Sequence, residues 1–308
     1  MCCRIFLQGL KNEMKRIIFL SLILIQPLFL LSFENETLQS LSGVVFDFRY
    51  RALEPGEIIM VFMTENSTVK KAVIRFLEKE FLLVNRGVEW EPQAFIGLDL
   101  AIKPGSYLMK VYVEKIDGAW EILQKEFQVK AKEFPVKKLW LEERYVTPPP
   151  TELERIRRES EILDMVYSVV TPHWLGRGRF IMPCQGEVSP NFGERRIYNN
   201  RTRSSHSGID ISSSQGSPVK ASNSGMVVLA SNLYFSGLTV IIDHGLGLFT
   251  LYCHFSKIKV RRGQLVMKGD VVGEIGATGR VTGPHLHWAV KLLGSRIDPF
   301  ALIALPFD

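Results

Sequence analysis

Four of the six histidines, together with one aspartate, form the group of residues in this chain best suited to chemistry. They are His206, Asp210, His254, His285 and His287. Imidazole nitrogens and carboxylate oxygens are ligands that zinc prefers, and a catalytic zinc site takes three from the protein and leaves a fourth position to water. The two histidines left over can exchange protons near neutral pH. The group therefore predicts a hydrolytic metal site.

The spacing of these residues indicates the elements that must position them. His206 and Asp210 are four residues apart, so one turn can aim both side chains inward. His285 and His287 are two apart within an apolar run, and alternate residues of a strand share a face. Either pair alone often arises by chance, but both pairs together, with a further histidine at 254, are a strong indication. These residues alone do not say which of His285 and His287 is the ligand.

Two histidines and the cysteines are expected to lie outside this chemistry. His244, between two expected strands, is interpreted as a turn residue, and His173 has no partner in the sequence. Cys253 precedes His254, and in a regular strand it would point to the opposite face. A disulfide between Cys184 and Cys253 and a pair of small buried thiols fit the sequence equally well.

The first half of the chain predicts an antiparallel β domain, which we assign to residues 33–145. Residues 107–113 and 127–131 alternate between apolar and polar side chains, as expected of half-buried strands. Turn pairs punctuate the strands at Pro55-Gly56 and Pro104-Gly105, which favours a small sandwich. The segment has no cluster of metal ligands or nucleophiles, so a spacer or binding module is expected.

Residues 146–180 predict a linker and one helix, and residues 181–308 a second β domain. Three prolines from position 148 make an extended linker, and Thr151 is expected to cap the helix that follows. The helix is expected to brace the two domains. From Ile181 onward glycine becomes frequent and short apolar strands recur without helical periodicity, which is typical of an all-β catalytic domain.

The motifs around the histidines resemble the LytM/lysostaphin-type zinc peptidases, family M23. The matching segments are the F-G-x-R at 192–195, the G-[IV]-D at 208–210, the glycine-rich runs at 216–225 and 266–279, the Y-x-H ending at His254, the G-P-H-L-H-W at 283–288, and Asp298-Pro299. This similarity covers about residues 180 to 300. More loosely, the I-G-L-D-L-x3-P-G-x-Y run at 96–107 is similar to an Ig-like domain that precedes some envelope members of the family.

The resemblance implies a mainly β protein, with an N-terminal Ig-like β-sandwich, a linker helix, and a C-terminal antiparallel-sheet peptidase domain of the barrel-sandwich-like LytM type. It implies one Zn²⁺ per catalytic domain and assigns the roles as follows: His206, Asp210 and His287 bind zinc, His285 is the general base, and His254 stabilises charge. Asn191 and Arg195 are candidates for the substrate groove, although a structural turn or salt bridge would explain them equally well.

The N-terminus predicts export. Lys15 and Arg16 precede an apolar run that is broken by Gln26 and Pro27, which is typical of a secretory signal peptide, with a membrane anchor as the alternative for residues 1–32. Met14 is a better start for this signal than Met1. We therefore expect a periplasmic or cell-envelope protein that contacts a membrane only through an uncleaved N-terminal segment. The formal net charge of +6 is too weak and too dispersed to predict nucleic-acid binding.

These observations predict a zinc metalloendopeptidase that hydrolyses peptide cross-links of peptidoglycan, with the D-Ala–diaminopimelate bond as the expected target. The alternative is a catalytically silent envelope regulator that activates a cell-wall amidase, and a regulatory envelope protein is an expected partner in either case. A carrier domain of barrel-sandwich type would need a modifiable lysine. Lys268 lacks the second flanking methionine of such a site, and the histidines would be left unexplained.

Overall fold

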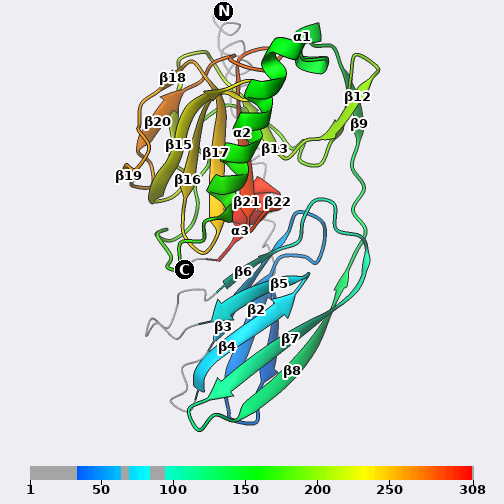
Figure 1. Cartoon of the computed structure of the whole chain (residues 1–308), viewed down its shortest axis with the longest axis vertical. Coiled ribbons are helices and arrows are strands. Elements are labelled where there is room, and N and C mark those ends of the chain that lie inside the picture. The colour runs from blue at the N-terminus through cyan, green and yellow to red at the C-terminus, as the bar shows by residue number, and fades with distance from the viewer. Residues whose placement is uncertain (1–32, 64–68, 84–93, 307–308) are drawn as a thin grey trace, which may run out of the picture. The chain divides into compact units, whose positions relative to one another are not determined.

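The computed structural model describes residues 33–63, 69–83 and 94–306, and their elements are almost all strands (Figure 1). The prediction of a mainly β chain is confirmed. The predicted signal peptide falls in residues 1–32 and so lies outside the described residues. Within the described ranges, no helix has the length and apolar character needed to cross a membrane.

The N-terminal strands form two four-stranded antiparallel sheets, ordered β1-β2-β3-β6 and β5-β4-β7-β8. Their bounds are β1 Glu34–Gln39, β2 Val45–Tyr50, β3 Ile58–Met63, β4 Val69–Phe76, β5 Lys79–Leu83, β6 Ala94–Gly97, β7 Gly105–Lys115 and β8 Trp120–Val129. Inward residues of both sheets, such as Phe48 and Val111, share one fully buried core. Because every second residue of β7 points into this core, the apolar alternation in the sequence is the direct cause of the sandwich.

The C-terminal strands build one large sheet, ordered β10-β13-β21-β17-β16-β15-β19, with β22 paired to β21. Their bounds are β10 Glu187–Ser189, β13 Gly208–Ser212, β15 Gly225–Leu233, β16 Gly237–Asp243, β17 Leu248–Phe255, β19 Leu265–Val266, β21 His285–Leu292 and β22 Ser295–Ile297. A small sheet, β14-β20-β18, packs against one face and contributes to the core around Tyr252 and Trp288. It consists of β14 Pro218–Lys220, β20 Val271–Glu274 and β18 Lys257–Ile258.

A third small sheet pairs one strand that follows the N-terminal sandwich with two strands of the C-terminal region. Strand β9, Val136–Leu139, pairs in parallel with β11, Arg195–Tyr198, which pairs in turn with β12, Thr202–Ser205. The short helix α1, Glu143–Val146, follows β9, and helix α3, Pro299–Ala304, ends the described chain. The N-cap of α3 is Asp298, whose carboxylate accepts from the backbone N–H of Phe300.

The long helix α2, Pro150–Ser168, differs from its prediction in two ways. It begins at Pro150 with Pro149 at the N-cap, so Thr151 is not the cap, because proline is well suited to the first helical turn. Its apolar side chains, among them Leu163 and Val166, pack on the large sheet rather than between the two β regions. Figure 1 shows α2 lying across β15, β16 and β17.

Both cysteines of the described chain are free. Burial raises the pKa of the Cys184 thiol to about 11 and, despite a hydrogen bond with Thr239, that of Cys253 to about 12. Of the two predictions for these residues, free thiols fit the structure and a disulfide does not, with Cys253 buried and Cys184 half-buried. His244 does lie between β16 and β17 as expected, yet it is fully buried and bonds to Ser224 O and Thr250 Oγ1.

Candidate metal centre and active site

Two strands and one turn bring together the side chains of His206, Asp210 and His287. His206 directly follows β12, Asp210 lies in β13, and His287 lies in the neighbouring strand β21. Asp210 and His287 are directly opposite each other in the antiparallel register, so their side chains share one face of the sheet. The tight turn between β12 and β13 then places His206 beside them, as its spacing from Asp210 predicted.

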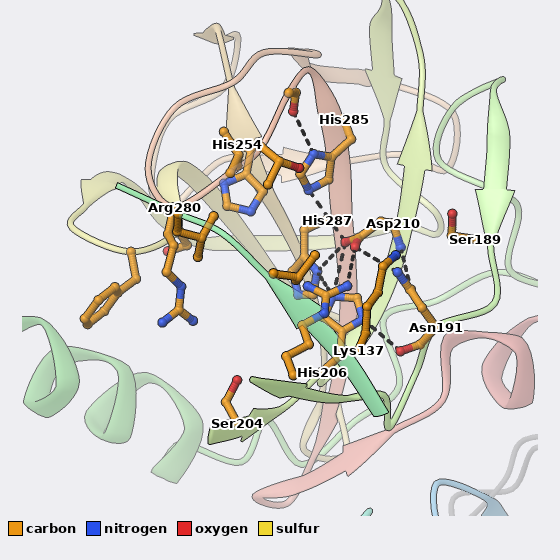
Figure 2. A pocket seen from close by; sticks show the side chains of 18 of the residues that line it. Lys137, Ser189, Asn191, Ser204, His206, Asp210, His254, Arg280, His285 and His287 are labelled. Atoms are coloured by element: carbon orange, nitrogen blue, oxygen red, sulfur yellow. Dashed lines mark hydrogen bonds and ion pairs between the residues drawn. The ribbon is translucent and has the colours of Figure 1, made fainter. Parts of the chain in front are cut away.

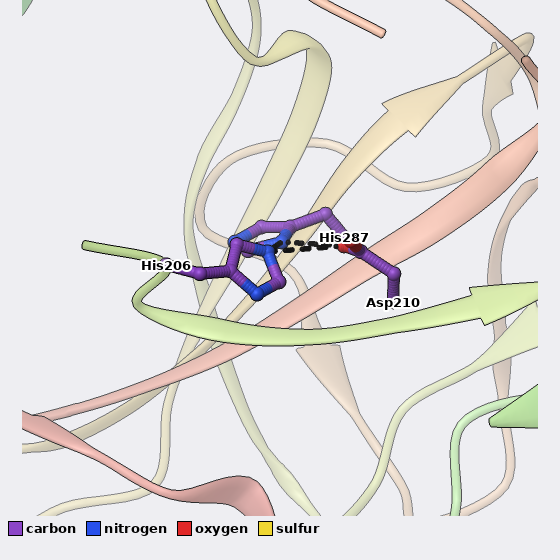
Figure 3. A group of neighbouring side chains, drawn as sticks. All are labelled: His206, Asp210 and His287. Carbon is purple, nitrogen blue, oxygen red and sulfur yellow. Dashed lines mark hydrogen bonds and ion pairs between the residues drawn. The ribbon is translucent and has the colours of Figure 1, made fainter. Parts of the chain in front are cut away.

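The ligand atoms of this group converge. His206 Nε2 lies 2.8 Å from His287 Nδ1 and 3.1 Å from Asp210 Oδ1, and His287 Nδ1 lies 3.0 Å from the same oxygen. One ligand atom from each residue falls within 4.8 Å of the other two (Figure 3). Two imidazole nitrogens and a carboxylate oxygen at this separation are a donor set that one zinc ion can bind.

Neighbouring residues orient these donors. His206 donates its Nδ1–H to Asn191 O at 3.0 Å, which leaves Nε2 unprotonated toward the other two residues. Asp210 Oδ2 accepts from Asn191 Nδ2 at 2.9 Å and from Arg196 Nη2 at 2.7 Å. Burial raises the pKa of Asp210, but the adjacent imidazoles of His206 and His287 outweigh it and hold the pKa well below its usual range. The aspartate is therefore a carboxylate, the form that binds metal.

The fit to zinc thus depends on more than the identity of the three residues. Zinc-bound histidines generally donate their second nitrogen to an oxygen acceptor, and zinc-bound carboxylates are generally hydrogen-bonded through the other oxygen. His206 and Asp210 both meet this condition. The three donors come from a half-buried pocket, which leaves room for a fourth ligand from solvent.

His285 lies at the rim of this group with its proton acceptor facing inward. Its Nδ1–H donates to Gly283 O at 2.9 Å, and its Nε2 lies 3.6 Å from Asp210 Oδ1. Burial lowers the pKa of His285, so the neutral imidazole is favoured. An unprotonated nitrogen facing the three candidate metal donors is the arrangement that a general base requires.

His254 reaches the same pocket through an irregularity in β17. Its φ of +68° lies in the left-handed region, and the β16–β17 register shifts beside it. The ring centroid lies 5.0 Å from that of His285, and Nδ1–H donates to Thr278 O at 2.8 Å. Burial, together with His287 and His285, lowers the pKa of His254 to about 3. The ring is therefore neutral, with Nε2 as an acceptor.

This irregularity also corrects one expectation. Regular alternation was expected to point Cys253 away from the face that His254 serves. Instead, Cys253 is the register partner of His287 and lies on the same face of the sheet, while the left-handed backbone at the next residue turns His254 toward the pocket. Cys253 is nevertheless outside the group of converging ligand atoms, as the sequence predicted.

A pocket of about 480 Å³ contains all five predicted metal and catalytic residues (Figure 2). Asn191 also lines it, whereas Arg195 does not. The arginine that faces the site is the next one along β11, Arg196, because successive strand residues point to opposite sides. Lys137 and Arg280 line the pocket as well, although no motif in the sequence pointed to either of them.

The comparisons with known proteins agree with this geometry. The model for peptidase family M23 matches residues 204–299. The peptidoglycan DD-endopeptidase ShyA of Vibrio cholerae is 39% identical over 121 residues, which is 39% of this chain and 28% of that protein. The DD-carboxypeptidase/endopeptidase Mpg of Neisseria gonorrhoeae is 39% identical over 119 residues, again 39% of this chain and 27% of the relative. The chain therefore spans little more than a quarter of the length of these curated relatives.

One solved structure is similar over a much larger part of the chain. A crystal structure from Pseudomonas aeruginosa, assigned to peptidase M23, superposes with a TM-score of 0.62 at 32% sequence identity and covers 82% of this chain and 95% of its own. The match therefore extends well beyond the segment that carries the histidines. With a relative of this identity covered over nearly its whole length, and the family model falling on the residues of the pocket, this chain belongs to peptidase family M23.

Proposed function

We propose that this protein is a zinc metalloendopeptidase that hydrolyses peptide cross-links of peptidoglycan, with the D-Ala–diaminopimelate bond as its target. The observation that carries the proposal is the convergence of His206, Asp210 and His287 in the same pocket as His285 and His254. Relatives named as peptidoglycan DD-endopeptidases support the substrate class. Because their substrate lies in the cell wall, we also propose that the protein is exported to the periplasm or envelope.

In this proposal His206, Asp210 and His287 hold one zinc ion. When bound, zinc polarises the scissile carbonyl and brings the pKa of a water ligand down to about 7. Asn191 and Arg196 keep the Asp210 carboxylate in place through its second oxygen. His206 is buried and Asp210 and His287 are half-buried, which lowers the local dielectric constant and so strengthens each of these electrostatic interactions.

His285 and His254 have distinct parts in moving the proton. His285 accepts the proton of the attacking water at Nε2 and returns it to the leaving amine, since its Nδ1–H is committed to Gly283 O. The neutral His254 likewise presents an unprotonated Nε2, because its Nδ1–H donates a hydrogen bond to Thr278 O. His254 therefore accepts a hydrogen bond from water or from the scissile N–H, and it donates to an oxyanion only once it has gained a proton.

The alternative, a silent regulator that activates an amidase, is less well supported. A pocket used only for recognition needs neither three converging metal donors nor two imidazoles with free acceptors. Those features are what a hydrolytic site requires. A regulatory envelope protein remains compatible with the enzymatic proposal as a partner.

The experiment is digestion of purified sacculi, with mass spectrometry of the released muropeptides. We expect new D-Ala carboxyl termini with zinc supplied, none with a chelator, and a loss of at least roughly 100-fold in His285→Ala, because general-base catalysis contributes about 10²–10⁴-fold. His173→Ala changes an exposed histidine outside the pocket and is the matched control. Wild-type protein that binds zinc yet releases no new termini would contradict the proposal.

A further inference from the structure

Arg280 is held in an unusual way for a side chain that lines a pocket. Its guanidinium carbon lies 4.8 Å from the ring centroid of Tyr198 and 4.8 Å from that of Phe235. All three residues line the same pocket as the metal donors, and Figure 2 shows Arg280 on the His254 side. Aromatic faces attract a guanidinium and hold it flat while its N–H donors stay available at the edge.

The backbone that carries Arg280 is also fixed. Arg280 N–H donates to Phe235 O at 2.7 Å, and Gly279 before it has a φ of +78°. One residue earlier, Thr278 accepts the Nδ1–H of His254 through its carbonyl oxygen. The loop that positions a reacting histidine therefore also positions the arginine. A side chain held in place before binding loses little conformational entropy when a ligand arrives.

The charges in the pocket leave Arg280 without an anion. Within the described ranges, no carboxylate lies at ion-pair distance from it, whereas Arg196 is paired with Glu194 and Asp210. Asp210 is the one acidic side chain among the described residues that line the pocket, and its oxygens are already engaged by other groups. The pocket thus has a surplus of positive charge at Arg280, which favours an anionic ligand there.

We propose that Arg280 binds a free carboxylate of the substrate close to the scissile bond. This inference rests on the proposed function. In a D-Ala–diaminopimelate cross-link, the carbon attached to the scissile nitrogen carries such a carboxylate, and it is the free carboxylate nearest the bond. A planar guanidinium can donate two parallel N–H bonds to it. Arg280 is then the residue that selects this cross-link over an amidated one or over a glycine bridge, neither of which offers that carboxylate.

The test compares two synthetic cross-linked peptide dimers that differ only at this carboxylate, one as the free acid and one as the primary amide. We expect wild-type protein to favour the acid by roughly 10- to 100-fold in kcat/KM, as a charge-assisted hydrogen bond implies. Arg280→Gln should lose this preference by cleaving the acid more slowly, while its rate on the amide stays within about threefold of wild type. Zinc content, measured in parallel, should not change.

Arg262→Gln is the matched control, since Arg262 is an exposed arginine outside the pocket. It should keep the wild-type preference. An Arg280→Gln protein that keeps the full preference for the acid would overturn the proposal. So would equal losses on acid and amide, because those would mean that Arg280 acts only by holding the loop of Thr278 and His254.

A binding measurement separates this proposal from the proposed function. The His285→Ala variant, loaded with zinc, is titrated with both dimers, with and without Arg280→Gln. Tighter binding of the acid that Arg280→Gln abolishes supports the role of Arg280 even if wild-type protein cleaves neither dimer, a result that would contradict only the proposed endopeptidase. Equal binding of acid and amide by His285→Ala contradicts the role of Arg280 whatever the outcome of the cleavage assay.

Discussion

Asp210 divides its two oxygens between two tasks. Oδ1 faces the ring nitrogens of His206 and His287, while Oδ2 accepts from Asn191 and Arg196. The carboxylate can therefore offer a metal a single oxygen without giving up its anchors. Arg196 also withdraws negative charge from the carboxylate, so Asp210 would be a weaker donor to a bound metal ion than an isolated aspartate. A weaker donor would leave such an ion more electrophilic toward a water ligand.

The role of Asn191 in this arrangement can be measured. Asn191→Ala removes the Nδ2 donor to Asp210 Oδ2 and the Oδ1 acceptor for Asp210 N–H, so we expect zinc affinity to fall by roughly 10- to 100-fold. Competition with a chromogenic chelator gives the affinity directly. Asn232→Ala, at an exposed position outside the metal pocket, should leave it unchanged. Equal zinc affinity in the two variants would contradict the supporting role.

For individual side chains, the sequence predicted the site as far as periodicity allows. Strand alternation was enough to place His285 and His287 on one face, but for that same reason it could not rank them as ligands. Arg195 and Arg196 show what happens where strand alternation cannot be recognised in the sequence. Strand β11 is four residues long and has no clear apolar alternation, so nothing in the sequence showed which arginine would face inward. The individual catalytic roles of His285 and His254 stay predictions.

Among the elements, the loop from Thr278 to Arg280 is the one on which most of the site depends. It accepts the hydrogen bond of His254 and carries Arg280, whose N–H donates to Phe235 O in the turn between β15 and β16. Thr278 Oγ1 accepts from Leu238 N–H at the start of β16. None of this was visible in the sequence beyond a recurrence of glycine, because hydrogen bonds between distant loops leave no periodic pattern. The start of α2 was misplaced for a related reason, since a proline run fits both an extended linker and a first helical turn.

Gly279 gives a test of how tightly this loop is packed. A Cβ there would lie 2.5 Å from Gly237 N and 2.5 Å from Phe235 O, and φ is +78°. We expect Gly279→Ala to lower the free energy of unfolding by about 2–5 kcal/mol, the sum of left-handed strain and overpacking. Urea denaturation measures the change.

Gly294 supplies the matched control, because it also has a positive φ, of +83°, yet a Cβ there would meet nothing within 4 Å. Gly294→Ala should therefore cost only the strain of about 1–2 kcal/mol. If the two variants lost the same stability, the loop would have to be less closely packed than its distances indicate.

Within the described residues, the N-terminal sandwich and the peptidase sheet are not cleanly separated. Ile58, Met60 and Phe95 of the sandwich share one buried cluster with residues of β21, β22 and α3. Asp99 adds a bidentate ion pair with Arg296 beside it. The sequence predicted two β regions from composition and turns, but not this shared core, because apolar residues that face a partner domain have the same pattern as those that face their own.

The shared cluster predicts cooperative unfolding. We expect a single calorimetric transition for the wild-type protein and, for Phe95→Ala, a loss of about 3–5 kcal/mol together with separation into two transitions, since the fully buried ring joins the two regions. Phe48→Ala removes a ring from the core of the sandwich alone and should lower the transition temperature while keeping one transition. A single transition in Phe95→Ala would show that the regions are coupled by other contacts.

The contact between His206 and His287 has a consequence for the stability of the fold. The two residues are 81 positions apart in the chain, so an ion held between them acts as a removable cross-link over a long loop. A ligand that binds only the folded arrangement of these residues stabilises the folded state by mass action. If the site holds zinc as proposed, the resistance of this protein to heat and to proteolysis should rise with the free zinc concentration around it. Where zinc is scarce, the proposed activity and the stability of the fold should then fall together.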